Sequence, residues 1–248
     1  MHHKILMNNS KKQAGHNQLL YTCGEKMSEE TKALTLNPQL EAFQNNLLKK
    51  YDKENQNIPK GQILFVGSSL MEIFPIEQWQ AEGKVKFSKH IYNRAVRATT
   101  THFLLEHINT QIFDLAPSKI FINIGTNDIG FQVPENEFLS NYDKILRQIK
   151  EKLPLCEVYV MRYYPINNVA FGNDMDEKTL FETRSNEAFQ DASDKIAKLA
   201  GKYNFHFIDA NEDLADQSGN LKKELTFDGA HMLPNGYEIV LNNLKKYL

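Results

Sequence analysis

The segment ILFVGSSL, residues 63–70, joins a short apolar run to a glycine and two hydroxyl side chains. Such a run, with β-branched residues, is typical of a strand buried on both faces of a sheet, and the glycine lets the backbone turn sharply where the strand ends. Ser68 and Ser69 would then lie at the carboxyl end of a strand, the edge at which parallel sheets bind ligands. Taken alone, two serines here are more typical of a helix cap, so the rest of the chain decides between these interpretations.

Similar apolar runs recur and alternate with amphipathic stretches. The runs at 90–96, 119–125, 156–161 and 205–209 predict further strands, and helices are expected between them, including 134–152 and 177–203. Thr99, Thr100 and Thr101 are candidate caps for another helix, and Trp79 is expected as a core plug or as a pocket wall. Alternating strands and helices specify a parallel sheet covered on both faces and wound by right-handed crossovers.

Composition excludes several classes of protein. The chain has 248 residues, a formal net charge of -2 and no basic tract interleaved with aromatics, so nothing indicates a nucleic-acid partner. No apolar run is long enough to span a bilayer, which predicts no integral membrane association. Two cysteines, Cys23 and Cys156, imply no disulfide framework and no cysteine-based metal site, and they are compatible with a cytoplasmic location.

The N-terminal part of the chain has a different pattern. Residues 1–36 are expected to be a flexible extension, and residues before Met27 could be upstream sequence, with Met27 as the natural start. From Asn37 the spacing of apolar residues predicts an amphipathic helix, and residues 37–248 are expected to form one domain that includes it.

Four polar residues at the predicted sheet edges have complementary chemistry. Ser69 follows the first strand, Asn127 follows the strand at 119–125, and Asp228 and His231 lie near the C-terminus. A serine nucleophile needs a base, and the base needs an acceptor that fixes its tautomer, so Asp228 and His231 could supply both. The side-chain amide of Asn127 could donate to an oxyanion. Individually, each residue is more typical of a turn, a cap or a surface position.

Four short blocks carry a resemblance to a known family, in order: Gly67-Ser68-Ser69-Leu70, Asn93-Arg94-Ala95, Gly125-Thr126-Asn127-Asp128 and Asp228-Gly229-Ala230-His231. Over about residues 61–248 the chain resembles the SGNH (GDSL-type) hydrolases, including platelet-activating-factor acetylhydrolase-like members. The resemblance implies a flavodoxin-like three-layer αβα sandwich with a five-stranded parallel sheet, the SGNH hydrolase fold. It also implies ester hydrolysis through an acyl-serine, with no cofactor.

Matched by motif position, the resemblance gives each residue a role. Ser69 would be the nucleophile, His231 the base and Asp228 its orienter. The oxyanion hole would comprise the backbone N–H groups of Ser69 and Ala98 and the side chain of Asn127. Asp128 and the pair Asn93-Arg94 are interpreted as structural.

Two blocks depart from the family pattern. The usual Gly-Asp-Ser is Gly67-Ser68-Ser69, and Ser68 could replace the local hydrogen bonds of the missing acid. The second block normally offers glycines, where this chain has Ala95, Arg97 and Ala98. A Cβ disfavours positive φ and narrows the approach to a substrate carbonyl, although Ala98 keeps its amide donor.

Other residues are candidates for substrate binding. Arg97 could bind an anionic substrate group, but a salt bridge to a nearby carboxylate is the favoured alternative. A set of side chains near strand ends could line an acyl or leaving-group pocket, or equally pack in the core: Phe131, Tyr163, Tyr164, Phe171 and Met232. His102 and His107 are five residues apart, which does not place them on one helix face as a zinc pair, so no metal site is expected.

The favoured function is a serine esterase that hydrolyses short acyl or acetyl esters of small molecules. Acetylated sugars are an equal possibility for the substrate. A lysophospholipase or a thioesterase would use the same machinery, and a non-catalytic binding protein on a hydrolase scaffold is an alternative of another class. The sequence does not indicate whether the protein is a monomer or an oligomer.

Overall fold

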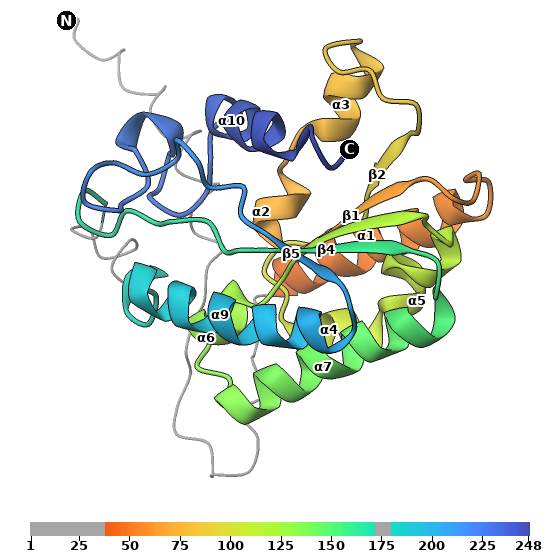
Figure 1. Cartoon of the computed structure of the whole chain (residues 1–248), viewed down its shortest axis with the longest axis horizontal. Coiled ribbons are helices and arrows are strands. Elements are labelled where there is room, and N and C mark those ends of the chain that lie inside the picture. Colours follow the sequence, from red (N-terminus) through yellow and green to blue (C-terminus); the bar gives the residue numbers. More distant parts are fainter. Residues whose placement is uncertain (1–37, 172–179) are drawn as a thin grey trace, which may run out of the picture. The chain divides into compact units, whose positions relative to one another are not determined.

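A five-stranded parallel sheet is the centre of the fold in the computed structural model, which describes residues 38–171 and 180–248 (Figure 1). The strands are β1 (Ile63–Gly67), β2 (Ile91–Asn93), β3 (Lys119–Asn123), β4 (Glu157–Met161) and β5 (His206–Ile208). Their order is β2-β1-β3-β4-β5, and every neighbouring pair is parallel. This is the flavodoxin-like order, so the predicted fold class is confirmed.

Helices connect the strands. They are α1 (Pro38–Asn55), α2 (Ser69–Glu72), α3 (Ile76–Ala81), α4 (Thr101–Glu106), α5 (Ile108–Gln111), α6 (Thr126–Gly130), α7 (Glu135–Lys152), α9 (Asn186–Lys202) and α10 (Pro234–Leu244). Two 3-10 segments, Phe113–Leu115 and Lys223–Leu225, complete the regular structure of the described residues.

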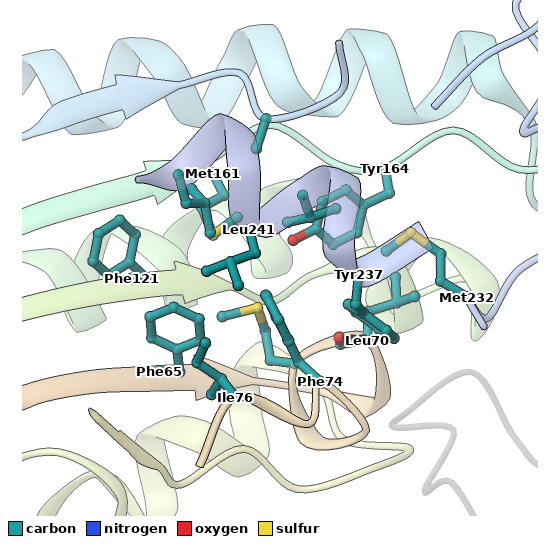
Figure 2. Close-up of a cluster of buried hydrophobic side chains, with 14 of the residues drawn as sticks. Phe65, Leu70, Phe74, Ile76, Phe121, Met161, Tyr164, Met232, Tyr237 and Leu241 are labelled. Carbon is teal, nitrogen blue, oxygen red and sulfur yellow. Dashed lines mark hydrogen bonds between the residues drawn. The ribbon is translucent and has the colours of Figure 1, made fainter. Parts of the chain in front are cut away.

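Alternate residues of each strand face two separate hydrophobic clusters. In β1, Ile63 and Phe65 belong to the cluster with α2, α3 and α10, whereas Leu64 and Val66 belong to the cluster with α4, α5, α7 and α9. Figure 1 shows these two groups of helices on opposite faces of the sheet. Figure 2 shows side chains of β1, β3 and β4 pointing toward Tyr237 and Leu241 of α10. Because both faces are covered, the interiors of the strands are apolar, and polar residues such as Lys119, Asn123 and Glu157 lie at strand ends.

The N-terminal prediction falls largely outside the described residues, which begin at Pro38. The expected amphipathic helix is present as α1. The chain divides into two units, Met1–Leu47 and Leu48–Leu248, with the boundary inside this helix. No helix in the described ranges combines the length and the apolar character needed to cross a membrane.

The helix expected at 177–203 is shorter than predicted. Residues 177–179 lie outside the described part of the chain, and residues 182–185 are not helical. The helix α9 begins at Asn186, because the Ser185 side chain accepts a hydrogen bond from the Ala188 N–H at 3.0 Å and so caps the first turn. The hydrophobic periodicity alone gave no sign of this start.

The threonines expected to cap α4 act differently. Thr100 is the N-cap residue, but its side chain makes no capping hydrogen bond. Thr101 instead donates its backbone N–H to Asp128 Oδ2 at 3.0 Å and its hydroxyl to Oδ1 at 2.5 Å. Asp128 is 1% exposed and braces α6 against the start of α4. This contact supports the structural interpretation of Asp128.

Gly67 is required where β1 meets β3. A Cβ built on Gly67 would lie 2.0 Å from the Asn123 carbonyl oxygen and 2.8 Å from Met71 Cγ. The contact with the carbonyl involves backbone of a central strand, which cannot move away without breaking its own ladder. The glycine therefore sets how closely the carboxyl ends of the two strands approach.

We predict that Gly67→Ala lowers the free energy of unfolding by about 2 kcal/mol or more, because the methyl group overlaps strand backbone. Gly201→Ala is the matched control. Gly201 lies in α9 with open space around the added Cβ, so its replacement should be neutral or stabilising by up to about 1 kcal/mol. Urea unfolding of both variants measures this, and equal midpoints would contradict the prediction.

A second prediction concerns Asp128. Burial raises the pKa of its carboxyl to about 6, although hydrogen bonds from Thr101 act in the opposite direction. The unfolded chain has a carboxyl pKa of about 3.9, so between about pH 4 and pH 6 the folded state binds more protons. The free energy of unfolding therefore falls as the pH rises through this window. Asp128→Asn removes this contribution while keeping an acceptor for Thr101.

Between pH 4 and pH 7.5, the free energy of unfolding of wild type should fall by about 3 kcal/mol more than that of Asp128→Asn. Urea unfolding of the two proteins at several pH values provides the measurement. Other titrating groups are common to both proteins and cancel in the comparison. A stability difference that stays constant with pH would contradict the assignment.

Candidate active site

Ser69 is the first residue of α2, directly after β1, and its hydroxyl faces an imidazole. The Ser69 Oγ atom lies 2.9 Å from His231 Nε2, although 162 residues separate them. Ser68 is the N-cap residue of α2, yet its side chain makes no capping hydrogen bond. Ser68 therefore occupies the cap position without a side-chain cap, and the Ser69 hydroxyl has a partner that can act as a base.

The imidazole of His231 is held from behind by Asp228. His231 Nδ1 lies 2.6 Å from Asp228 Oδ2, while Asp228 Oδ1 accepts the backbone N–H groups of Ala230 at 2.9 Å and His231 at 2.7 Å. Thr226 closes the loop, since its hydroxyl donates to the His231 carbonyl at 2.6 Å. The Asp-x-x-His spacing thus forms a tight turn in which one carboxylate binds both the ring and the backbone of the same histidine.

The environment of Asp228 favours its ionised form. Burial alone would raise the pKa of its carboxyl, but the hydrogen bond and charge of His231 and the two backbone N–H donors outweigh burial, and the pKa is lowered. An ionised carboxylate can only accept, so His231 Nδ1 carries the hydrogen of this bond. The Nε2 lone pair then faces Ser69, which is the tautomer that a general base needs.

Asn127 lies at the start of α6, after β3, next to the serines. Its Nδ2 atom donates to Ser68 Oγ at 2.7 Å and to the Thr99 carbonyl at 3.0 Å. Ser68 Oγ also accepts the Thr99 N–H at 3.3 Å. The loops after β1, β2 and β3 therefore meet at one hydroxyl, and both amide hydrogens of Asn127 are already engaged.

Ala98 has the positive φ that glycine normally provides in the second block. Its φ is 57°, in the left-handed region that glycine enters freely and alanine enters at a cost of about 1 kcal/mol. The loop is held on either side of it, since Val96 N–H donates to the Gly67 carbonyl at 3.0 Å and the Thr99 hydroxyl donates to the Val96 carbonyl at 2.6 Å. The turn therefore forms without the glycine.

Asn93 and Arg94 serve as scaffold beneath this loop. Asn93 Nδ2 donates to the Met71 carbonyl at 2.6 Å, and its Oδ1 accepts the Ala95 N–H at 3.1 Å. Arg94 is 2% exposed, with an ion pair to Glu54 at 3.1 Å. These contacts support the structural interpretation of both residues.

Arg97 forms the salt bridge that was the favoured alternative for it. Its guanidinium binds Glu72 of α2 through two bonds, Nε to Oε2 at 2.5 Å and Nη2 to Oε1 at 2.7 Å. The ion pair joins the loop after β2 to α2. An anionic substrate group would have to compete with Glu72 for this side chain.

The candidate pocket residues separate into two groups. Tyr163, Tyr164 and Met232 are 3%, 1% and 2% exposed and belong to the two core clusters, and Figure 2 shows Tyr164 and Met232 within one of them. Trp79 is also a core residue, at 5% exposure. Phe131 and Phe171 are half-buried. The packing alternative is therefore favoured for the two tyrosines and the methionine.

Sequence reasoning missed two side chains at the site. The Phe227 ring stacks on His231, with centroids 5.8 Å apart and planes 13° from parallel, and it is 52% exposed. Arg184 Nη2 donates to Asn127 Oδ1 at 3.2 Å. Phe227 could have been noticed because it directly precedes the Asp228 block. Arg184 is far from every block in the sequence, so only the folded structure reveals it.

Comparison with known proteins agrees with this geometry. The sequence model of the GDSL-like lipase/acylhydrolase family matches residues 67–239. A solved structure from Streptococcus pneumoniae, provisionally described as a platelet activating factor, superposes with a TM-score of 0.74 and 33% identity, over 85% of this chain and 94% of that one.

Two curated relatives are more distant. Platelet-activating factor acetylhydrolase IB subunit alpha1 of Bos taurus is 23% identical over 188 residues, 75% of each chain. The isoamyl acetate-hydrolyzing esterase of Saccharomyces cerevisiae is 26% identical over 138 residues, 51% of this chain and 55% of the esterase. With the family match spanning most of the described domain, the chain belongs to the GDSL-like lipase/acylhydrolase family and is a hydrolase of ester bonds.

Proposed function

We propose that this protein is a serine esterase that cleaves short acyl esters of small molecules through an acyl-serine intermediate. The observation that supports this most directly is the continuous chain from Ser69 Oγ to His231 Nε2, at 2.9 Å, and from His231 Nδ1 to Asp228 Oδ2, at 2.6 Å. The nucleophile lies within hydrogen-bond reach of the base, and the base within hydrogen-bond reach of the orienting carboxylate.

The reaction proceeds in two steps with balanced proton transfers. Ser69 Oγ attacks the ester carbonyl while its proton passes to His231 Nε2, and the ionised Asp228 stabilises the imidazolium. The tetrahedral intermediate collapses, the alcohol leaves with the proton from Nε2, and the acyl group remains on Ser69. Water then attacks the acyl-serine, gives a proton to Nε2, and releases the acid as that proton returns to Ser69.

The oxyanion would be bound by the backbone N–H groups of Ser69 and Ala98 and by the Asn127 amide. Asn127 Nδ2 donates to Ser68 Oγ and to the Thr99 carbonyl. A substrate oxygen therefore shares or replaces one of these acceptors, and the Ser68 hydroxyl, unlike the Thr99 backbone carbonyl, can rotate away.

The preference for short acyl groups rests on the relatives. Two of them are described as acting on acetyl esters, an acetylhydrolase and an isoamyl acetate-hydrolyzing esterase. Acetylated sugars remain within this class of substrate, whereas a lysophospholipase or a thioesterase would require a longer acyl chain or a thiol leaving group. The proposed catalytic domain comprises residues 37–248. A cytoplasmic location is part of this proposal, and the free thiol of Cys156 is compatible with it.

We predict that Ser69→Ala lowers kcat for p-nitrophenyl acetate by about 10⁴-fold or more, because the variant lacks the nucleophile. Wild type, but not the variant, should also be labelled covalently by a fluorophosphonate. Ser118→Ala is the matched control, since Ser118 directly precedes β3 and donates to the Gly61 carbonyl at the opposite edge of the sheet. Turnover that survives in Ser69→Ala would reject the nucleophile assignment.

A series of p-nitrophenyl esters tests the acyl preference. We expect kcat/KM for acetate and butyrate to exceed that for octanoate and decanoate by about tenfold or more, because tenfold corresponds to about 1.4 kcal/mol, which is the discrimination that one or two methylenes give when a pocket does not fit them. The corresponding acyl thioesters provide the comparison of leaving groups. Higher kcat/KM for the long chains would indicate a lysophospholipase-type pocket instead.

A further inference from the structure

Asn127 and Gly130 lie on the same face of α6, three residues apart. The Asn127 side chain has two ends with different partners. Its Nδ2 end faces Ser68 and Thr99, and its Oδ1 end accepts a hydrogen bond from Arg184 Nη2 at 3.2 Å. The guanidinium therefore lies behind the amide, on the side opposite the serines.

Arg184 is held in this place by several contacts. The residue is 7% exposed, its Nη1 donates to the Leu180 carbonyl at 2.7 Å, and its guanidinium lies over the Phe131 ring at 5.8 Å from the centroid. The preceding residue, Thr183, donates its hydroxyl to the Gly130 carbonyl at 2.8 Å. Two consecutive residues thus bind α6, the helix that carries the oxyanion-hole amide.

Gly130 makes room for the guanidinium. A Cβ built on it would lie 1.9 Å from Arg184 Nη2 and 2.0 Å from its Cζ. Gly130 is not among the residues with positive φ, so the backbone conformation does not require glycine there. The close approach of Arg184 does require it, which provides a second observation that this placement is specific.

We propose that Arg184 is a positioning residue of the oxyanion hole, which acts through Asn127; this inference rests on the proposed function above. An asparagine amide has two orientations of nearly equal shape, and only one presents N–H to the reaction centre. A guanidinium can only donate hydrogen bonds, so it stabilises the amide orientation in which Asn127 Oδ1 faces it. The flipped orientation, which would place Nδ2 against the guanidinium, is disfavoured. Its positive charge also polarises the amide, which strengthens donation from Nδ2 to the developing oxyanion.

Arg184→Met tests the proposal. The variant keeps an unbranched apolar side chain but removes the donor and the charge. We expect kcat for p-nitrophenyl acetate to fall about 10-fold to 100-fold with KM changed less than about 3-fold, because the lost interaction is strongest in the transition state. Arg184→Lys, which retains a charged donor, should recover part of the loss.

Gly130→Ala provides a second route to the same defect. Gly130→Ala retains Arg184 but displaces its guanidinium, so kcat should fall as it does in Arg184→Met. In the double variant, kcat should be less than about 2-fold lower than in Arg184→Met alone. This variant also decides the question if Arg184→Met fails to fold. If the factors by which the two single substitutions lower kcat multiply in the double variant, the proposal is wrong.

The decisive measurement uses the Asn127→Ala background. If Arg184 acts through Asn127, adding Arg184→Met to Asn127→Ala should change kcat by less than about 2-fold. A purely structural role would lower kcat by the same factor in both backgrounds. Failure of the proposed function is distinguishable, because then Asn127→Ala itself would leave kcat unchanged. A normal kcat in Arg184→Met with a reduced kcat in Asn127→Ala would refute only the role of Arg184.

Discussion

The close approach of β1 to β3 at their carboxyl ends is the constraint on which the site depends. Gly67 lacks the side chain that would collide with the Asn123 carbonyl, and the Ser68 N–H donates to this same carbonyl at 3.4 Å. Since β1 and β3 lie at the point where the strand order reverses, the segments that follow them diverge to opposite faces and leave a site between them. Ser69 and Asn127 occupy the two sides of that site.

The loop that carries His231 is anchored independently of Ser69. Asn167, from the segment after β4, donates its N–H to the Gly229 carbonyl at 2.7 Å, and Tyr237 of α10 donates its hydroxyl to the Leu70 carbonyl at 2.7 Å. These bonds tie the C-terminal elements to the segment after β4 and to α2. The 2.9 Å distance between Ser69 and His231 is therefore a result of the surrounding packing, which is how a preorganised site avoids reorganisation during the reaction.

Most of the sheet could be predicted because its information is local. Each buried strand is a short apolar run, and polar residues directly after β1 and β3 indicate the edge that holds the site. Contacts between distant segments could not be predicted in this way. Arg184 meets Asn127 only in the folded chain, and the buried position of Tyr164 depends on packing near α10. Local pattern also failed at the start of α9, because the helix begins after the N-cap residue Ser185, whose side chain accepts the Ala188 N–H, and the apolar period does not mark this position.

The second block shows how a loop can keep its backbone conformation when its residues change. An oxyanion donor from the backbone depends on the direction of an N–H group and not on a side chain. That direction is set at Ala98 by φ of 57°, which the flanking bonds of Val96 and Thr99 enforce. A glycine would reach the same φ at lower free-energy cost, so alanine at this position lowers the stability of the fold while the turn is kept. The hydrogen bonds of Val96 to Gly67 and of Thr99 to Ser68 and Val96 therefore hold the loop in this conformation without a glycine, and the proposed donor role of the Ala98 N–H is compatible with the substitution.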